Sequence, residues 1–313
     1  MALLIHLTDR DEAKWQAALQ AELGSYPVLR EVDDFDRAQV EYLFVWKPAP
    51  DTFDNLPNLK AVLSLGAGVD GLLRHPRLPD VPLVRFVDDE LSQCMADYVV
   101  AHATMHHRQF SRFAADQKAR RWVQDYPEPA QRITVGVMGL GAIGEFTVGK
   151  LLGLGFDVRG WSRSRREIAG VTCFAGREEF GDFLSETDIL ACLLPLTPET
   201  EGILNYATFS KLRHDRLPGG PAIINAARGG HQNEEDIVTA LNDGTLGAAS
   251  LDVFQSEPLP LDSPLWTARN CYVTPHIAAI SNERTGVLYF AKAIRDHEAG
   301  LPLPNVVDVT RGY

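Results

Sequence analysis

The sequence predicts an α/β protein with two domains, each built around a parallel β-sheet. Its 313 residues suggest about two domains. Short apolar runs, each long enough for one strand, alternate with segments of helical periodicity in both halves of the chain. That alternation is typical of a parallel sheet covered on both faces. With 45% hydrophobic and 23% charged residues, the chain can bury a core in each half.

The N-terminal part of the chain contains five expected strands, with helical segments between them. The strands are expected at Ala2–Leu7, Val28–Val32, Tyr42–Trp46, Lys60–Leu65 and Pro82–Phe86. The helical segments cover Asp11–Leu23 and residues 69–74. One long helical pattern without Pro or Gly then covers Asp89 to about Val123, which is long enough to link two domains.

The alternation restarts at Arg132 and gives a second set of strands. They are expected at Ile133–Met138, Asp157–Trp161, Asp188–Leu194, Pro221–Ala226, Gly247–Val253 and Cys271–Thr274. Helices lie between most of them, and six strands with helical crossovers suit a doubly wound domain. A last helix is expected over Ser281–Ala299.

Charge and cysteine usage narrow the class of protein. The net charge is −12 and no basic stripe is present, which argues against a nucleic-acid surface. No apolar run approaches the length of a membrane span. The four cysteines are scattered without a C-x-x-C motif, which suits a reducing compartment. His102 and His106 are four residues apart, but no third ligand accompanies them. We therefore expect a cytoplasmic protein without metal, nucleic-acid or membrane partners.

The most informative motif is a glycine triplet between a strand and a helix. Gly139, Gly141 and Gly144 form G-x-G-x-x-G, directly after the apolar run 133–138 and at the start of the helical pattern 142–152. The first glycine permits a tight turn, the second lets the backbone approach a pyrophosphate, and the third lets helix and strand pack closely. The motif predicts a dinucleotide site at a helix N-terminus. The alternative is a strand–helix turn without a ligand.

The end of the next strand indicates which dinucleotide binds. A site for NAD usually has Asp or Glu there, to accept a hydrogen bond from the ribose 2′-hydroxyl. This chain has neutral Ser162, followed by Arg163, Ser164, Arg165 and Arg166. A hydroxyl and guanidinium groups bind a 2′-phosphate by charge-assisted hydrogen bonds, so we predict NADPH. The alternative is a solvated basic turn.

Polar residues follow three of the later strands. Arg228 comes directly after an apolar strand, where open α/β sheets bind ligands, and it could hold a carboxylate or form a surface salt bridge. Asp252 ends the next strand, Glu257 follows five residues later, and His276 follows the last strand. A carboxylate and a histidine on adjacent strand ends could pair, which would fix the ring and favour its protonated form.

A loop in the N-terminal part is a further candidate. Residues 65–70, LGAGVD, follow a strand, and their small side chains leave backbone N–H groups free to bind an anion. A plain turn is the alternative.

Taken together, these motifs resemble a known family. Their order, GLGAIG, INAARG, LDVFQSEPLP and TPH, is similar to that of the D-isomer-specific 2-hydroxyacid dehydrogenases over nearly the whole chain. Finer features resemble the glyoxylate/hydroxypyruvate reductase A branch: VWKP at 45–48, LGAGVD, WSRSRR at 161–166, FAGREE, LLPLTPET and the C-terminal RGY. One departure is TPHIAAIS, which has alanines where many members have glycines after the histidine.

The resemblance implies two doubly wound domains and a homodimer. A flavodoxin-like substrate domain would comprise residues 1–98 plus 284–313, and a Rossmann NADP-binding domain would comprise residues 99–283. It also implies catalytic roles. Arg228 would hold the carboxylate and keto oxygen of the substrate, His276 would be the acid–base residue, and Glu257 would be its partner. Asp252 would meet the nicotinamide carboxamide.

The remaining implied contacts fall into two sets. The cofactor set comprises Gly139, Gly141, Ala142, Ile143, Gly144, Ser162, Arg163, Ser164, Leu194, Pro195, Thr200, Ala226, Ala227, Arg228, Asp252, His276 and Ala278. The substrate set comprises Trp46, Ala67, Gly68, Val69, Arg228 and His276. The expected activity is NADPH-dependent reduction of small 2-keto acids, with glyoxylate and hydroxypyruvate foremost. The alternatives are an NAD-linked D-2-hydroxyacid dehydrogenase of another substrate and a non-catalytic NADP(H)-sensing protein.

Overall fold

The computed structural model describes residues 1–312, which divide into two compact units. The first unit comprises Met1–Leu91 and the segment from Ser281 onward, and the second comprises Ser92–Ile280. The chain therefore passes from one unit to the other twice, and the first passage lies inside helix α3, Asp89–His107. The sequence had suggested boundaries at 98/99 and 283/284.

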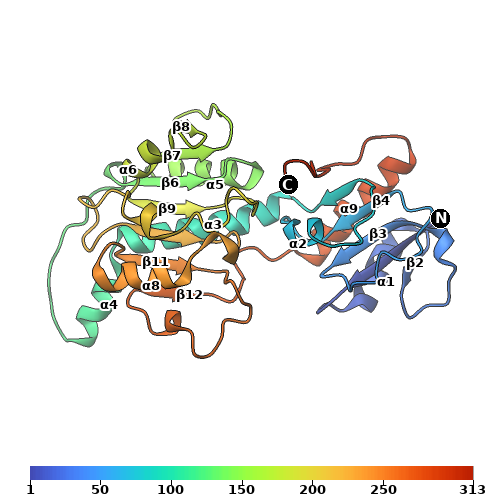
Figure 1. Ribbon diagram of the computed structural model, residues 1–313, viewed down its shortest axis with the longest axis horizontal. Helices are drawn as coiled ribbons and strands as arrows, with labels where there is room; N and C mark the ends of the chain where they lie inside the picture. The colour runs from blue at the N-terminus through green and yellow to red at the C-terminus, as the bar shows by residue number, and fades with distance from the viewer. Residues whose placement is uncertain (313) are drawn as a thin grey trace. The chain divides into compact units, whose positions relative to one another are not determined.

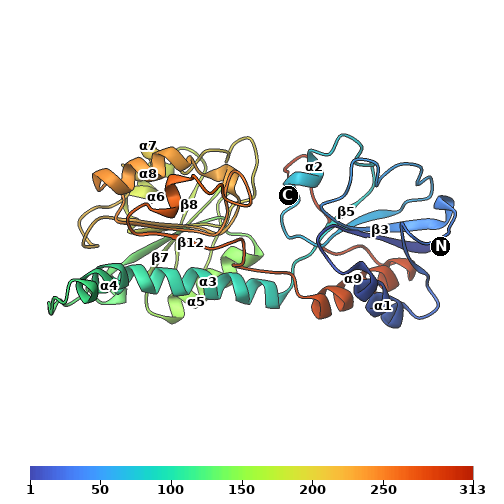
Figure 2. The ribbon, with the colours of Figure 1, turned by 90° about the horizontal axis from the view of Figure 1, so that it is seen from below.

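The first unit contains a five-stranded parallel sheet in the order β2-β1-β3-β4-β5 (Figure 1). Its strands are β1 Ala2–Leu7, β2 Val28–Arg30, β3 Val40–Trp46, β4 Ala61–Ser64 and β5 Leu83–Arg85. Its helices are α1 Glu12–Leu23, α2 Asp70–Leu73 and α9 Glu283–Glu298, with a short 3-10 turn at Arg37–Gln39. Helices α1 and α9 lie side by side on one face of this sheet (Figure 2). This strand order is that of flavodoxin-like folds.

Each face of this first sheet has its own core. Trp15 of α1 and Phe290 of α9 pack with Phe44 of β3 on one face. Leu43 of the same strand packs with Leu72 of α2 on the other. Neighbouring residues of β3 thus point to opposite faces and are both buried, because helices cover both sides of the parallel sheet.

The second unit contains a seven-stranded parallel sheet in the order β12-β11-β10-β9-β6-β7-β8. Its strands are β6 Thr134–Met138, β7 Asp157–Ser162, β8 Thr172–Ala175, β9 Ile189–Cys192, β10 Ala222–Asn225, β11 Ala248–Leu251 and β12 Cys271–Val273. The order reverses between β6 and β9, as in the doubly wound dinucleotide-binding fold. Two doubly wound parallel domains, the fold class expected from the sequence, are confirmed.

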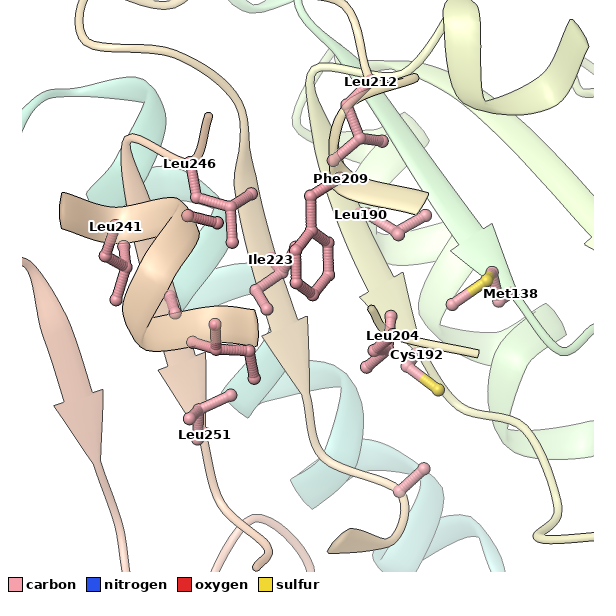
Figure 3. Close-up of a cluster of buried hydrophobic side chains, with 14 of the residues drawn as sticks. Met138, Leu190, Cys192, Leu204, Phe209, Leu212, Ile223, Leu241, Leu246 and Leu251 are labelled. Carbon is pink, nitrogen blue, oxygen red and sulfur yellow. The ribbon is translucent and has the colours of Figure 1, made fainter. Parts of the chain in front are cut away.

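Helices cover both faces of the second sheet (Figure 2). They are α3 Asp89–His107, α4 Phe110–Lys118, α5 Ala142–Gly153, α6 Phe180–Ser185, α7 Tyr206–Phe209 and α8 Glu234–Asp243, with 3-10 turns at Ala130–Arg132, Gly229–His231 and Pro264–Trp266. Figure 3 shows part of the core on the side of α7 and α8, where Phe209 lies beside Ile223 and Leu241 belongs to the same cluster. In β9, Leu190 and Cys192 belong to this core, while Ile189 and Ala191 belong to the core on the opposite face.

Two expectations about elements of the second unit were wrong. The single helix expected from Asp89 to about Val123 is two helices, because Gln109 adopts a left-handed conformation with φ +57 and ends the first. Gln109 is buried and accepts a hydrogen bond from Arg112, so the local contacts hold this break. The sheet also has a seventh strand, β8, which went unpredicted because it is short, lies at the edge and is only half-buried.

Among the described residues, no helix has the length and apolar character needed to cross a bilayer. Within residues 1–312, no group of three or more His, Cys, Asp or Glu side chains could hold a metal ion. All four cysteines are free thiols, and Cys192 is the one that is fully buried.

Candidate active site

The glycine turn after β6 has the geometry of a phosphate cradle. A Cβ on Gly144 would lie 1.8 Å from the carbonyl oxygen of Gly139, so helix α5 packs too closely on the turn for any side chain there. By contrast, a Cβ on Gly141 would meet nothing within 4 Å. No side chain caps α5, which leaves its first N–H groups available. The structure thus fits a pyrophosphate at this turn.

The end of β7 presents hydroxyl and guanidinium groups. The Ser162 hydroxyl donates to the carbonyl of Ser164 at 2.8 Å, which shapes the turn. Arg165 pairs with Glu179, and Arg166 pairs with Glu145 at 3.2 Å. Arg163 lies close enough to Glu199 to contribute to the lowered pKa of that carboxylate, after the larger effect of a hydrogen bond from Thr197. Ser162 and Arg163 therefore stand together at the strand end, where an NAD site would have a carboxylate.

The segment after β9 lies beside the glycine turn, because β9 pairs with β6. The N–H of Leu193 donates to the carbonyl of Met138 at 2.8 Å. The Thr200 hydroxyl donates to the carbonyl of Pro195 at 2.8 Å and accepts from the N–H of Thr197 at 2.9 Å. These bonds fix the backbone of a loop at the point where the strand order reverses, which is where ligands of this fold class bind.

The backbone of Arg228 is held by a buried amide network that sequence reasoning missed. The Asn225 side chain, at the end of β10, donates to the carbonyl of Arg228 at 3.0 Å and to Gln232 at 2.8 Å. Its oxygen accepts from the N–H of Ala227 at 3.1 Å. Gln232 in turn donates to the carbonyl of Val253, beyond β11. Both amide side chains are fully buried. The spacing of residues along the sequence could not reveal this burial, so the network was not predicted.

Glu257 and His276 form a hydrogen-bonded pair beyond the ends of β11 and β12. The Nδ1 of His276 lies 2.8 Å from a carboxylate oxygen of Glu257, whose other oxygen accepts from the N–H of Phe254 at 3.1 Å. Burial raises the pKa of Glu257, but these hydrogen bonds and the nearby charge of Arg228 outweigh it, so this pKa lies below its ordinary value. The carboxylate is therefore charged near neutral pH and orients the imidazole.

The Asp252 carboxylate organises the segment that carries His276. It is 1% exposed. One of its oxygens accepts from the Thr274 hydroxyl at 2.6 Å and from the N–H of Ile277 at 2.9 Å, and the other accepts from the N–H of Ala278 at 2.8 Å. The N–H of His276 donates to the backbone carbonyl of Asp252 at 2.8 Å. His276 itself has a left-handed φ of +56, a conformation that a non-glycine residue keeps only when its surroundings fix it.

The candidate substrate residues of the first unit form a separate group after β3 and β4. The backbone N–H groups of Ala67, Gly68 and Val69 donate no hydrogen bond within the described chain. The ring of Trp46 packs against Gly66, where an added Cβ would lie 2.8 Å from the indole. The loop thus offers unpaired donors next to a rigid aromatic side chain, which suits a small anion.

Comparison with known proteins identifies the family. The sequence model described as the D-isomer specific 2-hydroxyacid dehydrogenase, NAD binding domain, matches residues 100–278. The chain is 40% identical over 309 residues to a glyoxylate/hydroxypyruvate reductase A of Yersinia enterocolitica, covering 96% of this chain and 97% of that protein.

Solved structures give the same assignment. A probable 2-hydroxyacid dehydrogenase from Rhizobium etli, in complex with NADP, HEPES and L(+)-tartaric acid, is 42% identical with a TM-score of 0.93, and the match covers 100% of this chain and 99% of that one. An NADPH-dependent glyoxylate/hydroxypyruvate reductase from Sinorhizobium meliloti, in complex with NADP and sulfate, is 43% identical with a TM-score of 0.92 and the same coverage. The resemblance inferred from the motifs is confirmed, and the chain belongs to the D-isomer specific 2-hydroxyacid dehydrogenase family.

Proposed function

We propose that this protein reduces small 2-keto acids with NADPH, converting glyoxylate to glycolate and hydroxypyruvate to D-glycerate. The observation that carries the proposal is the 2.8 Å hydrogen bond between Glu257 and His276, which follow β11 and β12, the next two strands along the sheet from β10 and Arg228. Paired imidazole and carboxylate form a proton donor, and a guanidinium stabilises a developing oxyanion. The names of the Yersinia and Sinorhizobium relatives support this choice of substrates.

The residues present fit NADPH. When bound, this cofactor supplies the hydride that reduces the keto carbon. The open face of Gly141 and the uncapped start of α5 would receive the pyrophosphate. Ser162 and Arg163 would receive the 2′-phosphate, which a carboxylate at this strand end would repel. Solved relatives with NADP or NADPH bound support the same cofactor.

The protein's part in the reaction follows from the strand-end residues. Nδ1 of His276 faces Glu257, so Nε2 carries the proton that passes to the keto oxygen as charge develops there. Arg228 holds the substrate carboxylate and stabilises the charge on the keto oxygen. Glu257 keeps the ring oriented, and His276 regains its proton from solvent after turnover. The products are the 2-hydroxy acid and NADP⁺.

Residues of the first unit select the substrate. The unpaired N–H groups of Gly68 and Val69 would bind the substrate carboxylate. Trp46, held against Gly66, would limit the group attached to the keto carbon to hydrogen or hydroxymethyl. Branched keto acids and phenylpyruvate would be poor substrates. The working form would be a homodimer in the cytoplasm.

The experiment that tests this function is a panel of 2-keto acids assayed with both NADPH and NADH. Loss of NADPH absorbance with glyoxylate and hydroxypyruvate, at higher kcat/KM than with phenylpyruvate or with NADH, is the expected result. NADPH binding without turnover of any 2-keto acid would instead support a cofactor-sensing protein. Equal or better turnover with NADH at low concentration would contradict the assignment of the 2′-phosphate site.

A further inference from the structure

A chain of buried hydrogen bonds leads from helix α3 to the segment that carries His276. The Tyr98 hydroxyl lies 2.8 Å from the Thr274 hydroxyl, which donates to the Asp252 carboxylate at 2.6 Å. Because the Thr274 hydroxyl has one hydrogen and gives it to the carboxylate, Tyr98 must be the donor to Thr274. Burial raises the pKa of Tyr98, so its hydroxyl keeps its proton over the working range of pH. All of these residues belong to the second unit.

The far end of this chain fixes the backbone on both sides of His276. The Asp252 carboxylate accepts from the N–H groups of Ile277 and Ala278, and the Asp252 carbonyl accepts from the N–H of His276. The carboxylate thus binds the backbone of the two residues that follow His276, and it determines where the imidazole points only if its own orientation is fixed. The described contacts give it one side-chain donor, Thr274, which Tyr98 orients.

We propose that Tyr98 and Thr274 are positioning residues for the proton donor: they hold the Asp252 carboxylate in the orientation that keeps the 276–278 backbone, and hence the His276 ring, in place for catalysis. The inference rests on the proposed function for its activity readout. Its structural core, a hydroxyl chain that fixes the 276–278 segment, can be tested without turnover. The left-handed φ of His276 gives the reason such a chain is needed, because this backbone relaxes when its contacts are lost.

Three substitutions separate the hydroxyl chain from general packing. Thr274→Val keeps the side-chain shape and removes the hydroxyl, Thr274→Ser keeps the hydroxyl, and Tyr98→Phe removes only the phenolic oxygen. A matched control is Tyr272→Phe, which removes another phenolic oxygen, this one from strand β12. The Tyr272 hydroxyl donates to Ser111 on α4 at 2.5 Å and takes no part in the hydrogen bonds from Tyr98 to Asp252. The control should leave kcat unchanged.

We expect Thr274→Val to lower kcat about 5- to 30-fold, since it leaves a buried carboxylate short of one hydrogen bond. Tyr98→Phe should lower kcat by less, and Thr274→Ser should restore most of it. The double variant Tyr98→Phe/Thr274→Val should be no slower than Thr274→Val alone, because both act in one chain. The Kd for NADPH should change less than about threefold, because most of the proposed cofactor contacts lie on other strands.

The readout that does not depend on turnover is amide hydrogen exchange, measured on a peptide that spans residues 274–280. The N–H groups of Ile277 and Ala278 should exchange faster in Thr274→Val than in the unmodified protein, and at the same rate in Tyr272→Phe. Unchanged exchange in Thr274→Val, or equal loss of kcat in Thr274→Ser and Thr274→Val, would overturn the proposal. If the unmodified protein reduced no 2-keto acid, the proposed function would fail, while the exchange result would still decide whether the chain fixes this segment.

Discussion

Two glycines of the same turn should respond to alanine in opposite ways. At Gly141 an added Cβ meets nothing within 4 Å, and φ −80 with ψ −170 is open to alanine. Alanine is a poorer N-cap than glycine but also reduces the entropy of the unfolded chain, so stability should change by less than about 1 kcal/mol. At Gly144 the Cβ would lie 1.8 Å from the Gly139 carbonyl oxygen. Backbone must move there, at a cost of about 1–3 kcal/mol or more.

These costs translate into melting temperatures. At about 2–4 °C per kcal/mol for a domain of this size, Gly144→Ala should melt roughly 2–12 °C lower, and Gly141→Ala should melt close to the unmodified protein. NADPH should separate them again. At a concentration 100 times its Kd, the cofactor stabilises the unmodified protein by about 2.7 kcal/mol. If the Gly141→Ala methyl weakens Kd 100-fold, the same concentration stabilises that variant by only about 0.4 kcal/mol.

The assay is thermal unfolding of each variant with and without NADPH, together with a direct titration of cofactor binding. Gly141→Ala should keep its fold and lose most of the NADPH-dependent shift in Tm. An unchanged Kd for NADPH in Gly141→Ala would refute the reasoning, because it would show that the pyrophosphate does not approach the open face of this turn. A stable Gly144→Ala would show that α5 is packed less tightly on the turn than the structure indicates.

Four further variants test the proposed site. His276→Asn should lower kcat about 10²–10⁴-fold with Kd for NADPH nearly unchanged, since it removes proton transfer alone; a loss confined to binding would contradict this role. Arg163→Asp should raise Kd for NADPH much more than Kd for NADH, because it replaces an ion pair with repulsion, and equal effects on both cofactors would argue against a 2′-phosphate site. Glu257→Gln should lower kcat by less than His276→Asn does, because the imidazole remains but loses the carboxylate that orients it; an unchanged kcat would exclude a catalytic role for the pair. The pKa of Glu257 lies below its ordinary value, so the carboxylate stabilises the fold when the pH is above that ordinary value. This contribution is lost as the pH falls through the lowered pKa. Unfolding of Glu257→Gln measured over a range of pH should lack this dependence. Trp46→Ala should raise the ratio of phenylpyruvate to glyoxylate activity with folding retained, whereas a ratio that stays constant while stability falls by about 3–5 kcal/mol would make Trp46 a core residue only.

The fold could be predicted because most of its strands are clear apolar runs in the sequence. Segments such as ILAC of β9 and AIIN of β10 are buried on both faces, so they stand out as apolar runs between helical segments. The edge strand β8 has one neighbour and four residues, and none of its side chains is fully buried, so its sequence does not stand out as a strand. The break at Gln109 was equally hidden, because it comes from a left-handed residue that is neither glycine nor proline.

The candidate site was predictable in outline but not in its supporting contacts. Arg228, Glu257 and His276 could be proposed because each follows a strand, and parallel strands present their carboxyl ends at one edge. Thr274 follows the same strand as His276 and yet gave no signal. Its partner Tyr98 is 176 residues away in the chain, and only the packing of α3 against the sheet brings the two hydroxyl groups together. Hydrogen bonds between such distant residues leave no local pattern in a single sequence.

The order of the candidate motifs along the sheet has a geometric cause. Across the second sheet the strand order is β7, β6, β9, β10, β11, β12, and these strands carry in turn the proposed 2′-phosphate residues, the glycine turn, the 193–200 loop, Arg228, the two carboxylates and His276. At about 4.8 Å per strand, the row spans roughly 24 Å, from the proposed 2′-phosphate residues to His276. From β6 onward to β12, apart from the excursion to β7 and β8, chain order and spatial order coincide. Residues that are successive motifs in sequence are therefore successive neighbours along one sheet edge, and spacing alone places them in the order in which an extended dinucleotide would meet them.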